Sequence, residues 1–171
     1  MNQIQFTSQL SLHEYVKASF YTTYRRPVMI FFTLVGAFML VTSLLFYAGL
    51  GWQLGRLPLV QLFLGLYFLV LLPVLIYVKC KSSFNAKNRF TERIDWTVDH
   101  EWIAMKGETF ETKMTWDKVH RVVETREVFL IYQSKLLAHI LSKREMSREQ
   151  VQGFRGVVSG VLGMKNKLRV D

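Results

Sequence analysis

The chain contains very little cysteine. Cys80 is the only one among 171 residues, so no disulfide bond can form within the chain. Cysteine usage therefore gives no indication of an oxidising compartment. Proline is also scarce, with three residues, and no internal repeat, low-complexity tract or long linker interrupts the sequence. These absences argue against a disulfide-stabilised scaffold and against a tandem array.

The common motifs of catalysis and nucleotide binding are missing as well. The sequence contains no G-x-x-x-x-G-K-[ST], no G-x-G-x-x-G and no G-x-S-x-G. His120 and Glu124 are four residues apart, but in a predicted strand that spacing separates them by about 13 Å. No histidine is spaced as a metal ligand from another histidine, cysteine or acidic residue on one element. The sequence therefore predicts no metal, no cofactor and no enzymatic activity.

Asp, Glu, Lys, Arg and His are absent from two apolar runs, Val28–Leu50 and Leu57–Val78, which are 23 and 22 residues long. A helix needs about 20 apolar residues to cross the hydrocarbon core of a bilayer. Buried helices of soluble domains usually run 8–20 residues and keep a polar stripe, which these runs lack. The two runs predict a helical hairpin that crosses a membrane twice. Neither run holds a G-x-x-x-G pair, so close helix contact through glycine has no support.

Basic residues flank these runs, and they account for much of the net charge of +9. Arg25 and Arg26 precede the first run, and Lys79 and Lys81 follow the second. The connecting loop contains one basic residue, Arg56. This bias predicts that both termini are cytoplasmic. The middle of the chain is slightly acidic, which argues against a nucleic-acid partner. The absence of charge within the runs argues against a channel or transporter built from the hairpin alone.

The segment before the hairpin predicts a strand and a helix. Residues 3–7 alternate polar and apolar side chains, as in a short strand. Ser11 and Glu14 form the capping-box pattern at the start of an amphipathic helix. That helix is expected either to lie in the membrane interface or to pack on the soluble part of the chain.

The segment after the hairpin predicts an antiparallel sheet followed by a helix. Tight turns separate the short strand-forming segments, which favours a meander. Ser147 and Gln150 form a second capping box, and Phe154 lies in the apolar stripe of a helix of about 16 residues. The strands are expected at residues 90–98, 101–106, 109–115, 119–125, 128–133 and 136–141.

The predicted fold class is therefore an α+β membrane protein. It has a two-helix transmembrane hairpin, then an antiparallel sheet or partial barrel capped by a C-terminal helix. This order of elements is found in pleckstrin-homology-like domains, although OB-like and simple α+β layouts share parts of it. The expected divisions are an N-terminal strand and helix (1–26), the hairpin (27–80), the pleckstrin-homology-like domain (88–164) and a basic tail (165–171).

Several short motifs, in their order and spacing, resemble the YcxB-like family of bacterial membrane proteins. The resemblance implies a cytoplasmic pleckstrin-homology-like domain on a two-span hairpin in the bacterial cytoplasmic membrane. The family has no established activity, so the resemblance implies no catalytic residues. The chain departs from the pattern at 138–141, where relatives tend to show a proline before the basic pair. The motifs are Phe6-Thr7, Glu14-Tyr15, Trp116–Val119, Val128–Tyr132, His139–Arg144 and Phe154-Arg155.

Two sets of side chains are candidates for contact with a lipid or a protein partner. Trp96, Trp102 and Trp116 are expected to pack in the core, or else to line the mouth of an open barrel. The basic residues Lys165, Lys167 and Arg169 could touch anionic headgroups or could be a solvated end of the chain. Cys80 is either an inert thiol or an acylation site.

Two functions remain open. The first is a membrane-anchored cytoplasmic interaction module that binds a protein segment or lipid headgroups. The alternative is a small membrane immunity or stress protein that neutralises a toxin. The expected partners are the lipid bilayer and a protein of unknown identity.

Overall fold

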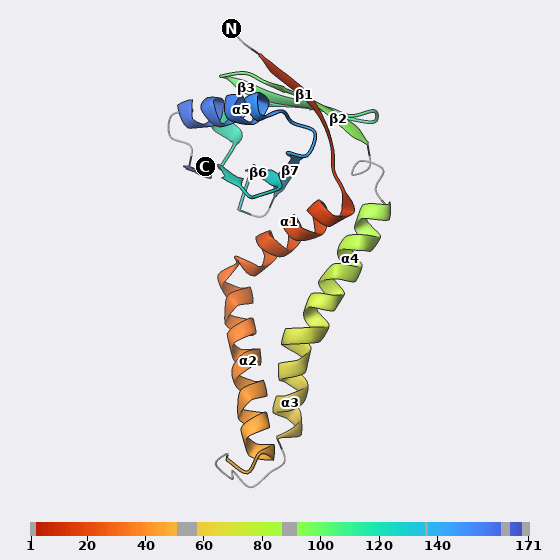
Figure 1. Cartoon of the computed structure of the whole chain (residues 1–171), viewed down its shortest axis with the longest axis vertical. Coiled ribbons are helices and arrows are strands. Elements are labelled where there is room, and N and C mark those ends of the chain that lie inside the picture. Colours follow the sequence, from red (N-terminus) through yellow and green to blue (C-terminus); the bar gives the residue numbers. More distant parts are fainter. Residues whose placement is uncertain (1–2, 51–57, 87–91, 136, 162–164, 169–171) are drawn as a thin grey trace. The chain divides into compact units, whose positions relative to one another are not determined.

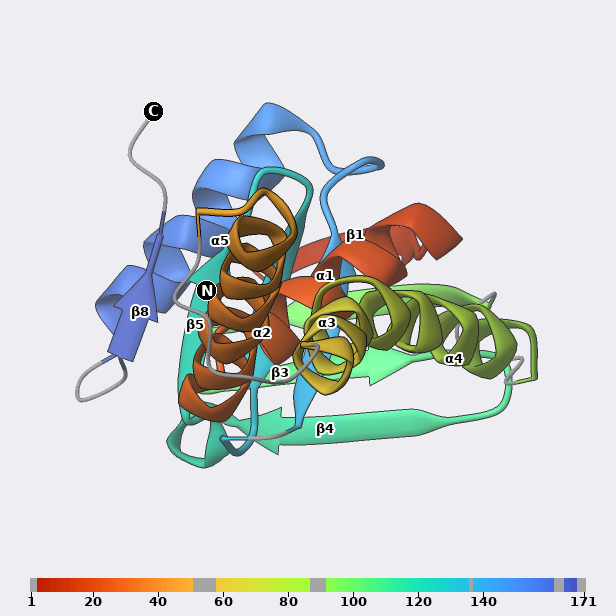
Figure 2. The same cartoon turned by 90° about the horizontal axis from the view of Figure 1, so that it is seen from below.

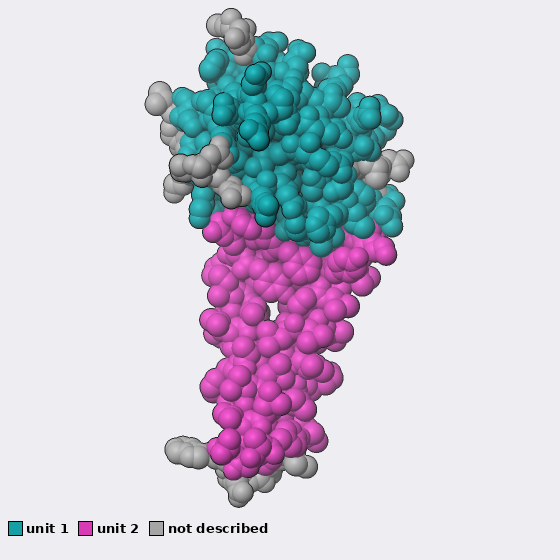
Figure 3. Space-filling view, viewed as in Figure 1, with its two compact units in different colours: residues 1–18, 83–171 teal, residues 19–82 magenta. Residues whose placement is uncertain are grey.

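The computed structural model describes residues 3–50, 58–86, 92–135, 137–161 and 165–168. The chain divides into two compact units, which Figure 3 shows in different colours. Unit 1 comprises residues 1–18 and 83–171, and unit 2 comprises residues 19–82. Unit 1 is thus built from both ends of the sequence, and unit 2 is the segment between them.

Unit 2 contains the predicted apolar helices. Helix α2 spans Pro27–Tyr47, and a second continuous helical segment spans Leu59–Ala86. The second segment extends beyond Val78 because nothing in the following residues breaks a helix. In the most apolar 18-residue stretch of α2, 11% of the residues are buried, and in that of the second helical segment 6% are buried. Every exposed large hydrophobic side chain of the described residues except Leu137 lies between positions 28 and 78. An apolar surface of this extent is unusual in a soluble monomer and is compatible with a membrane hairpin.

The second segment changes its helical geometry near a proline. It consists of α3 (Leu59–Leu66), a π-helical turn (Tyr67–Leu71) and α4 (Leu72–Ala86). Pro73 has no backbone N–H, so the carbonyl group of Leu69 loses its usual helical donor. The sequence predicts an irregularity at this point, and the π turn lies there.

Two glycines let α2 and α3 approach each other closely (Figure 1). A Cβ atom built on Gly65 would lie 2.6 Å from Leu40 Cγ and 3.0 Å from the Gly36 carbonyl oxygen. A Cβ atom on Gly36 would lie 2.8 Å from Phe68 Cβ. This contact was not predicted from the sequence, because the G-x-x-x-G motif requires two glycines on one helix. Here each helix contributes one glycine.

Sheet A of unit 1 joins the two ends of the chain. It consists of β1 (Ile4–Gln9), β2 (Arg93–Val98), β3 (Trp102–Lys106) and β4 (Glu111–Thr115), in that order and antiparallel. Phe6 pairs with Trp96, and both side chains are buried. The N-terminal strand therefore completes the sheet formed after the hairpin, and the helices are inserted between β1 and β2.

Sheet B is separate from sheet A, so the prediction of one continuous meander is wrong. A 3₁₀ turn at Trp116–Lys118 carries the chain out of sheet A. Sheet B has the order β7-β6-β5-β8. The short strand β8 pairs parallel to β5, in residues that the sequence analysis assigned to a basic tail. The strands are β5 (Arg121–Glu124), β6 (Val128–Tyr132), β7 (Ala138–Ser142) and β8 (Lys165–Lys167).

Helix α5 (Arg148–Gly160) supplies the centre of the core. Ser147 and Gln150 form the predicted capping box at its start. Phe154 is fully buried, and its ring lies 4.6 Å from that of Phe129, with Phe6 and Trp116 at 6.5 and 6.4 Å between centroids. One aromatic side chain thus contacts sheet A, the 3₁₀ turn and sheet B.

Helix α1 (Leu12–Tyr24) begins in unit 1, and its first turn packs on that unit. Its capping box is formed, since Ser11 N–H donates to Glu14 Oε2 at 2.8 Å. Ser142 of β7 donates to Glu14, and Lys17 forms an ion pair with Glu127. The sequence left two placements open for this helix, in the membrane interface or packed on the folded part of the chain. The start of the helix has the second placement.

Candidate functional site

The three tryptophans that follow the hairpin have different environments. Trp96 and Trp116 are 1% and 3% exposed, and Trp116 Nε1–H donates to the backbone oxygen of Asp99 at 2.8 Å. These two belong to the core and offer no contact surface. Trp102 is half-buried on β3, and the Lys113 Nζ atom lies 3.9 Å from the centroid of its ring. Trp102 is therefore the one of these three tryptophans that remains partly accessible on the surface.

Strand β8, which contains Lys165 and Lys167, lies at the edge of sheet B, beside β5 (Figure 2). Lys165 pairs with Arg121, and Lys167 pairs with Val123. Lys167 is exposed. Arg169 lies outside the described residues. Strand pairing thus places Lys165 beside Arg121, a residue that the sequence did not single out, and places Lys167 two residues further along β5.

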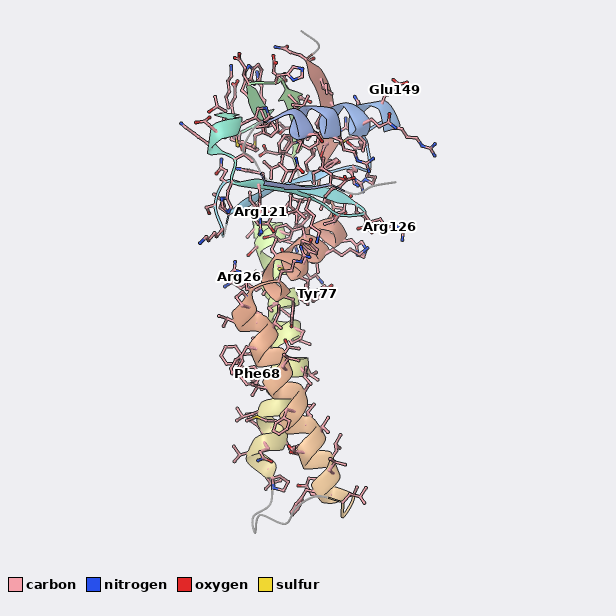
Figure 4. The ribbon with its side chains drawn as sticks, turned by 90° about the vertical axis from the view of Figure 1, so that its left-hand side faces the viewer. Arg26, Phe68, Tyr77, Arg121, Arg126 and Glu149 are labelled. Carbon is pink, nitrogen blue, oxygen red and sulfur yellow. The ribbon has the colours of Figure 1, made fainter. Side chains whose placement is uncertain are left out.

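Arg121 is held in place by an aromatic ring. Its guanidinium carbon lies 4.2 Å from the centroid of Tyr132, its partner on β6. The Nε atom of Arg121 is buried and has no hydrogen-bond partner among the described residues. Figure 4 shows Arg121 on the side of sheet B that faces away from α5. A positive charge is therefore fixed on this face of the sheet.

The turn from β6 to β7 lies at the same end of sheet B. His120 N–H donates to the backbone oxygen of Tyr132 at 2.7 Å, which places the start of β5 beside the end of β6. Gln133 N–H donates to the backbone oxygen of Leu137 at 3.0 Å and closes the turn. Lys135 is exposed, and Leu137 is 54% exposed. A basic and an apolar side chain thus protrude together beside Arg121.

A buried polar network links α1 to sheet B. Glu14 is 6% exposed, and it accepts hydrogen bonds from Ser11 N–H, Ser11 Oγ–H and Ser142 Oγ–H at 2.8, 2.8 and 2.7 Å. A buried carboxylate is costly unless its oxygens are paired, and here both are. The capping box indicates the local bonds, but nothing in the sequence indicates the bond to Ser142.

A second buried carboxylate, Glu124, binds two cations. Arg155 of α5 donates to it through Nε and Nη2 at 3.0 and 2.9 Å. Lys143 donates to the same carboxylate at 2.8 Å and to the backbone oxygen of Thr125 at 2.7 Å. The side chain of Glu124 has no exposed surface. Two of the short motifs that carry the family resemblance, at 139–144 and 154–155, thus supply these partners.

His139 on β7 is a half-buried titratable group whose Nε2 atom is buried. Its Nε2 atom has no partner among the residues that the structure describes. Burial lowers the pKa of its imidazole below the ordinary value of 6.5. A neutral His139 suits this position, and no cluster of three or more His, Cys, Asp or Glu side chains that could hold a metal occurs in the described parts of the chain.

The four residues that predict orientation lie at the ends of the apolar helices. Arg25 donates to the Tyr21 hydroxyl oxygen at 2.6 Å, and its guanidinium carbon lies 4.8 Å from the centroid of that ring. Arg26 occupies the N-cap position of α2. Lys79 and Lys81 are exposed on α4. None of these four side chains forms an ion pair with a described residue, so no carboxylate of the described chain neutralises their charges.

Comparison with known proteins gives one similarity. Residues 98–157 match the family model described as YcxB-like protein. The match runs from the end of β2 into α5, and it includes both partners of Glu124. No curated protein and no solved structure showed significant similarity to the chain.

Proposed function

Residues 98–157 form a YcxB-like segment, and from that premise we propose that this chain is a membrane-anchored interaction module. Unit 1 would be the module, and the apolar helices of unit 2 would be its anchor. The observation that carries the proposal is the pairing of β1 with β2. Because these strands flank the hairpin in the sequence, both ends of the anchor connect to one folded sheet. Such a module is held at the membrane by two covalent connections.

The composition of the helices supports a transmembrane anchor. Their large apolar side chains are exposed in the folded chain, and lipid would cover this surface. We propose that they span the bacterial cytoplasmic membrane with both termini inside. The basic residues at 25, 26, 79 and 81 favour this orientation under the positive-inside rule.

The architecture of unit 1 supports a pleckstrin-homology-like assignment. The antiparallel sheet A and sheet B, which is antiparallel except for β8, both pack around the buried ring of Phe154 from a C-terminal helix. The buried carboxylates Glu14 and Glu124 are occupied by hydrogen bonds that hold elements of the fold together. These side chains are used for structure, which favours binding over catalysis.

Accessibility of a single cysteine tests the membrane arrangement. In a Cys80→Ser background, a cysteine at Gln53 should react with a membrane-impermeant maleimide in intact cells. A cysteine at Lys106, on β3, should react only after the membrane is permeabilised. Labelling of Lys106→Cys in intact cells would contradict the proposed orientation.

Photo-crosslinking in native membranes tests the interaction. A photoreactive amino acid at Trp102 should give a discrete crosslinked protein that mass spectrometry can identify. The same amino acid at Glu149, an exposed residue in the first turn of α5 (Figure 4), is the control. Equal, diffuse crosslinking from both positions would contradict a specific partner at Trp102.

A further inference from the structure

We propose that the end of sheet B formed by Arg121, Lys118, Lys135, Lys167 and Leu137 docks on an anionic bilayer surface. This set of residues is called the basic tip below. The inference deepens the proposed function and rests on its membrane anchor, because it assigns the part of unit 1 that contacts lipid.

The first argument is an exposed apolar side chain of unit 1, Leu137. Outside positions 28–78, Leu137 is the one exposed large hydrophobic residue among those described. It stands at a tight turn, where Leu137 N–H donates to Ser134 Oγ at 3.1 Å. A leucine on a turn gains nothing from exposure to water, whereas insertion among acyl chains removes its surface from water.

The second argument is the basic charge at this end of sheet B and along its β8 edge. Lys118 ends the 3₁₀ turn, Lys135 lies two residues before Leu137, and Lys167 lies on β8; all three are exposed. None of them forms an ion pair with a residue that the structure describes. Asp117 is the acidic neighbour, so the tip remains strongly positive. Basic residues around an apolar side chain are typical of surfaces that bind anionic lipids.

The third argument is the fixed position of Arg121. Its guanidinium group rests on Tyr132, and its Nε–H group has no partner among the described residues. That Nε atom is buried, so a headgroup phosphate would accept from the outer N–H groups of the half-buried guanidinium. The strands supply a rigid base, and the lysines supply mobile charges around it. The combination fits a layer of anionic headgroups, with Leu137 reaching below them.

The anchor makes this contact feasible even if each interaction is weak. Unit 1 continues into the apolar hairpin at Ala18 and again at Ser83, so it is held near a bilayer. Docking is then an intramolecular event with a high effective concentration of lipid. Electrostatic attraction of this kind weakens with salt, because the Debye length is about 10 Å at 0.1 M ionic strength.

Lipid quenching of a fluorophore tests the proposal in the full chain. A Cys80→Ser, Leu137→Cys variant carries an environment-sensitive dye and is reconstituted into nanodiscs that contain acyl-brominated lipid. Quenching should be at least twofold stronger in discs with about 30% phosphatidylglycerol than in pure phosphatidylcholine discs, and 0.5 M salt should remove the difference. A dye at Lys106→Cys on β3 is the control and should be quenched weakly in both.

Charge removal supplies the second arm. Replacement of Lys118, Lys135 and Lys167 by Ser should abolish the extra quenching at Leu137→Cys. The charge-matched replacement of Arg93, Lys106 and Arg148 by Ser, all exposed positions away from the tip, should preserve it. Quenching at Leu137→Cys no greater than at Lys106→Cys would overturn the docking proposal. A spectral shift without bromine quenching would overturn it too, because it would show that protein covers the turn. Loss of the chain from the nanodisc fraction would instead contradict the membrane anchor.

Discussion

Ser142 donates a hydrogen bond of 2.7 Å to the Glu14 carboxylate, across 128 residues of sequence. The bond joins the first turn of α1 to the end of β7. Both groups are buried, so water cannot replace either partner without rearrangement. The start of the helix that leads to the apolar hairpin is therefore attached to the folded unit by a buried contact.

Replacement of Glu14 by Ala should destabilise unit 1 by about 1–3 kcal/mol, because buried donors lose their acceptor. Glu145→Ala is the matched control. Glu145 Oε1 lies 3.7 Å from Arg144 Nη2 on the surface. Removal of this carboxylate should change the free energy of unfolding by no more than about 0.5 kcal/mol. Thermal melts of the full chain in detergent would measure both. A melting temperature for Glu14→Ala equal to that of Glu145→Ala would contradict a structural role for the bond.

Phe154→Ala should be among the most damaging changes in the chain. It removes a fully buried ring that contacts Phe6, Trp116 and Phe129, and the expected cost is about 3–5 kcal/mol. Arg148→Ala, at an exposed position of the same helix, should cost within about 0.5 kcal/mol. If α5 were instead a membrane-binding helix, Phe154→Ala would weaken vesicle binding and leave the melting temperature nearly unchanged.

His139 should make stability depend on pH. Burial lowers its folded-state pKa, so the unfolded chain binds the proton more readily. Stability should therefore fall as the pH drops below the ordinary imidazole value of 6.5. The melting temperature should decrease between pH 7.5 and pH 5.5, and His139→Leu should reduce that decrease.

His120→Gln, at an exposed position, is the control and should keep the wild-type pH dependence. Glu127 titrates outside this range. The hydrogen bond from Lys17 lowers the pKa of Glu127 from 4.5. The stabilisation that this pair gives to the folded chain is therefore present above pH 4.5 and disappears in stronger acid. Identical pH profiles for wild type and His139→Leu would contradict the assignment.

Unit 1 should fold without the hairpin if both of its segments are present. The rings of Tyr15 and Phe84 lie 5.7 Å apart, so the ends of the two segments are close. A linker of about eight Gly and Ser residues, which reaches about 15 Å, should connect Ala18 to Ser83. Circular dichroism should show a cooperative melt and a mixture of strand and helix.

The fragment 83–168 alone lacks β1 and should aggregate, because the edge of β2 and the buried Trp96 become exposed. Size-exclusion chromatography would compare the two proteins. A monomeric, cooperatively melting 83–168 fragment would show that β1 is dispensable.

The sequence predicts best what depends on neighbouring residues. Both capping boxes, at Ser11 and Ser147, are present in the structure because their bonds span three residues. The apolar helices follow from an uninterrupted run of one residue class. Five of the six predicted strands overlap observed strands closely, and the segment 119–125 shortens to Arg121–Glu124 because the 3₁₀ turn precedes it.

Features that depend on distant residues were not predictable in this way. The three residues of β8 include two lysines and an asparagine, so no strand pattern marks them, and only pairing with β5 makes them a strand. Glu124, Lys143 and Arg155 read as ordinary charged residues until the fold brings them together. Of the candidate contact residues, Trp116 and Trp102 have the same sequence character, and only the packing of the sheets distinguishes a buried ring from an accessible one.

The insertion of the hairpin between β1 and β2 sets an order of events during synthesis. Thr7 on β1 and Asp95 on β2 form a hydrogen bond of 2.7 Å, yet 88 positions separate them. The ribosome completes β1 first, then both apolar helices, and only afterwards the strand that pairs with it. Sheet A therefore cannot form until the hairpin has left the ribosome. Synthesis of both apolar helices thus becomes a step that precedes the folding of unit 1, and a chain that stalls before it ends would leave β1 without its partner strand.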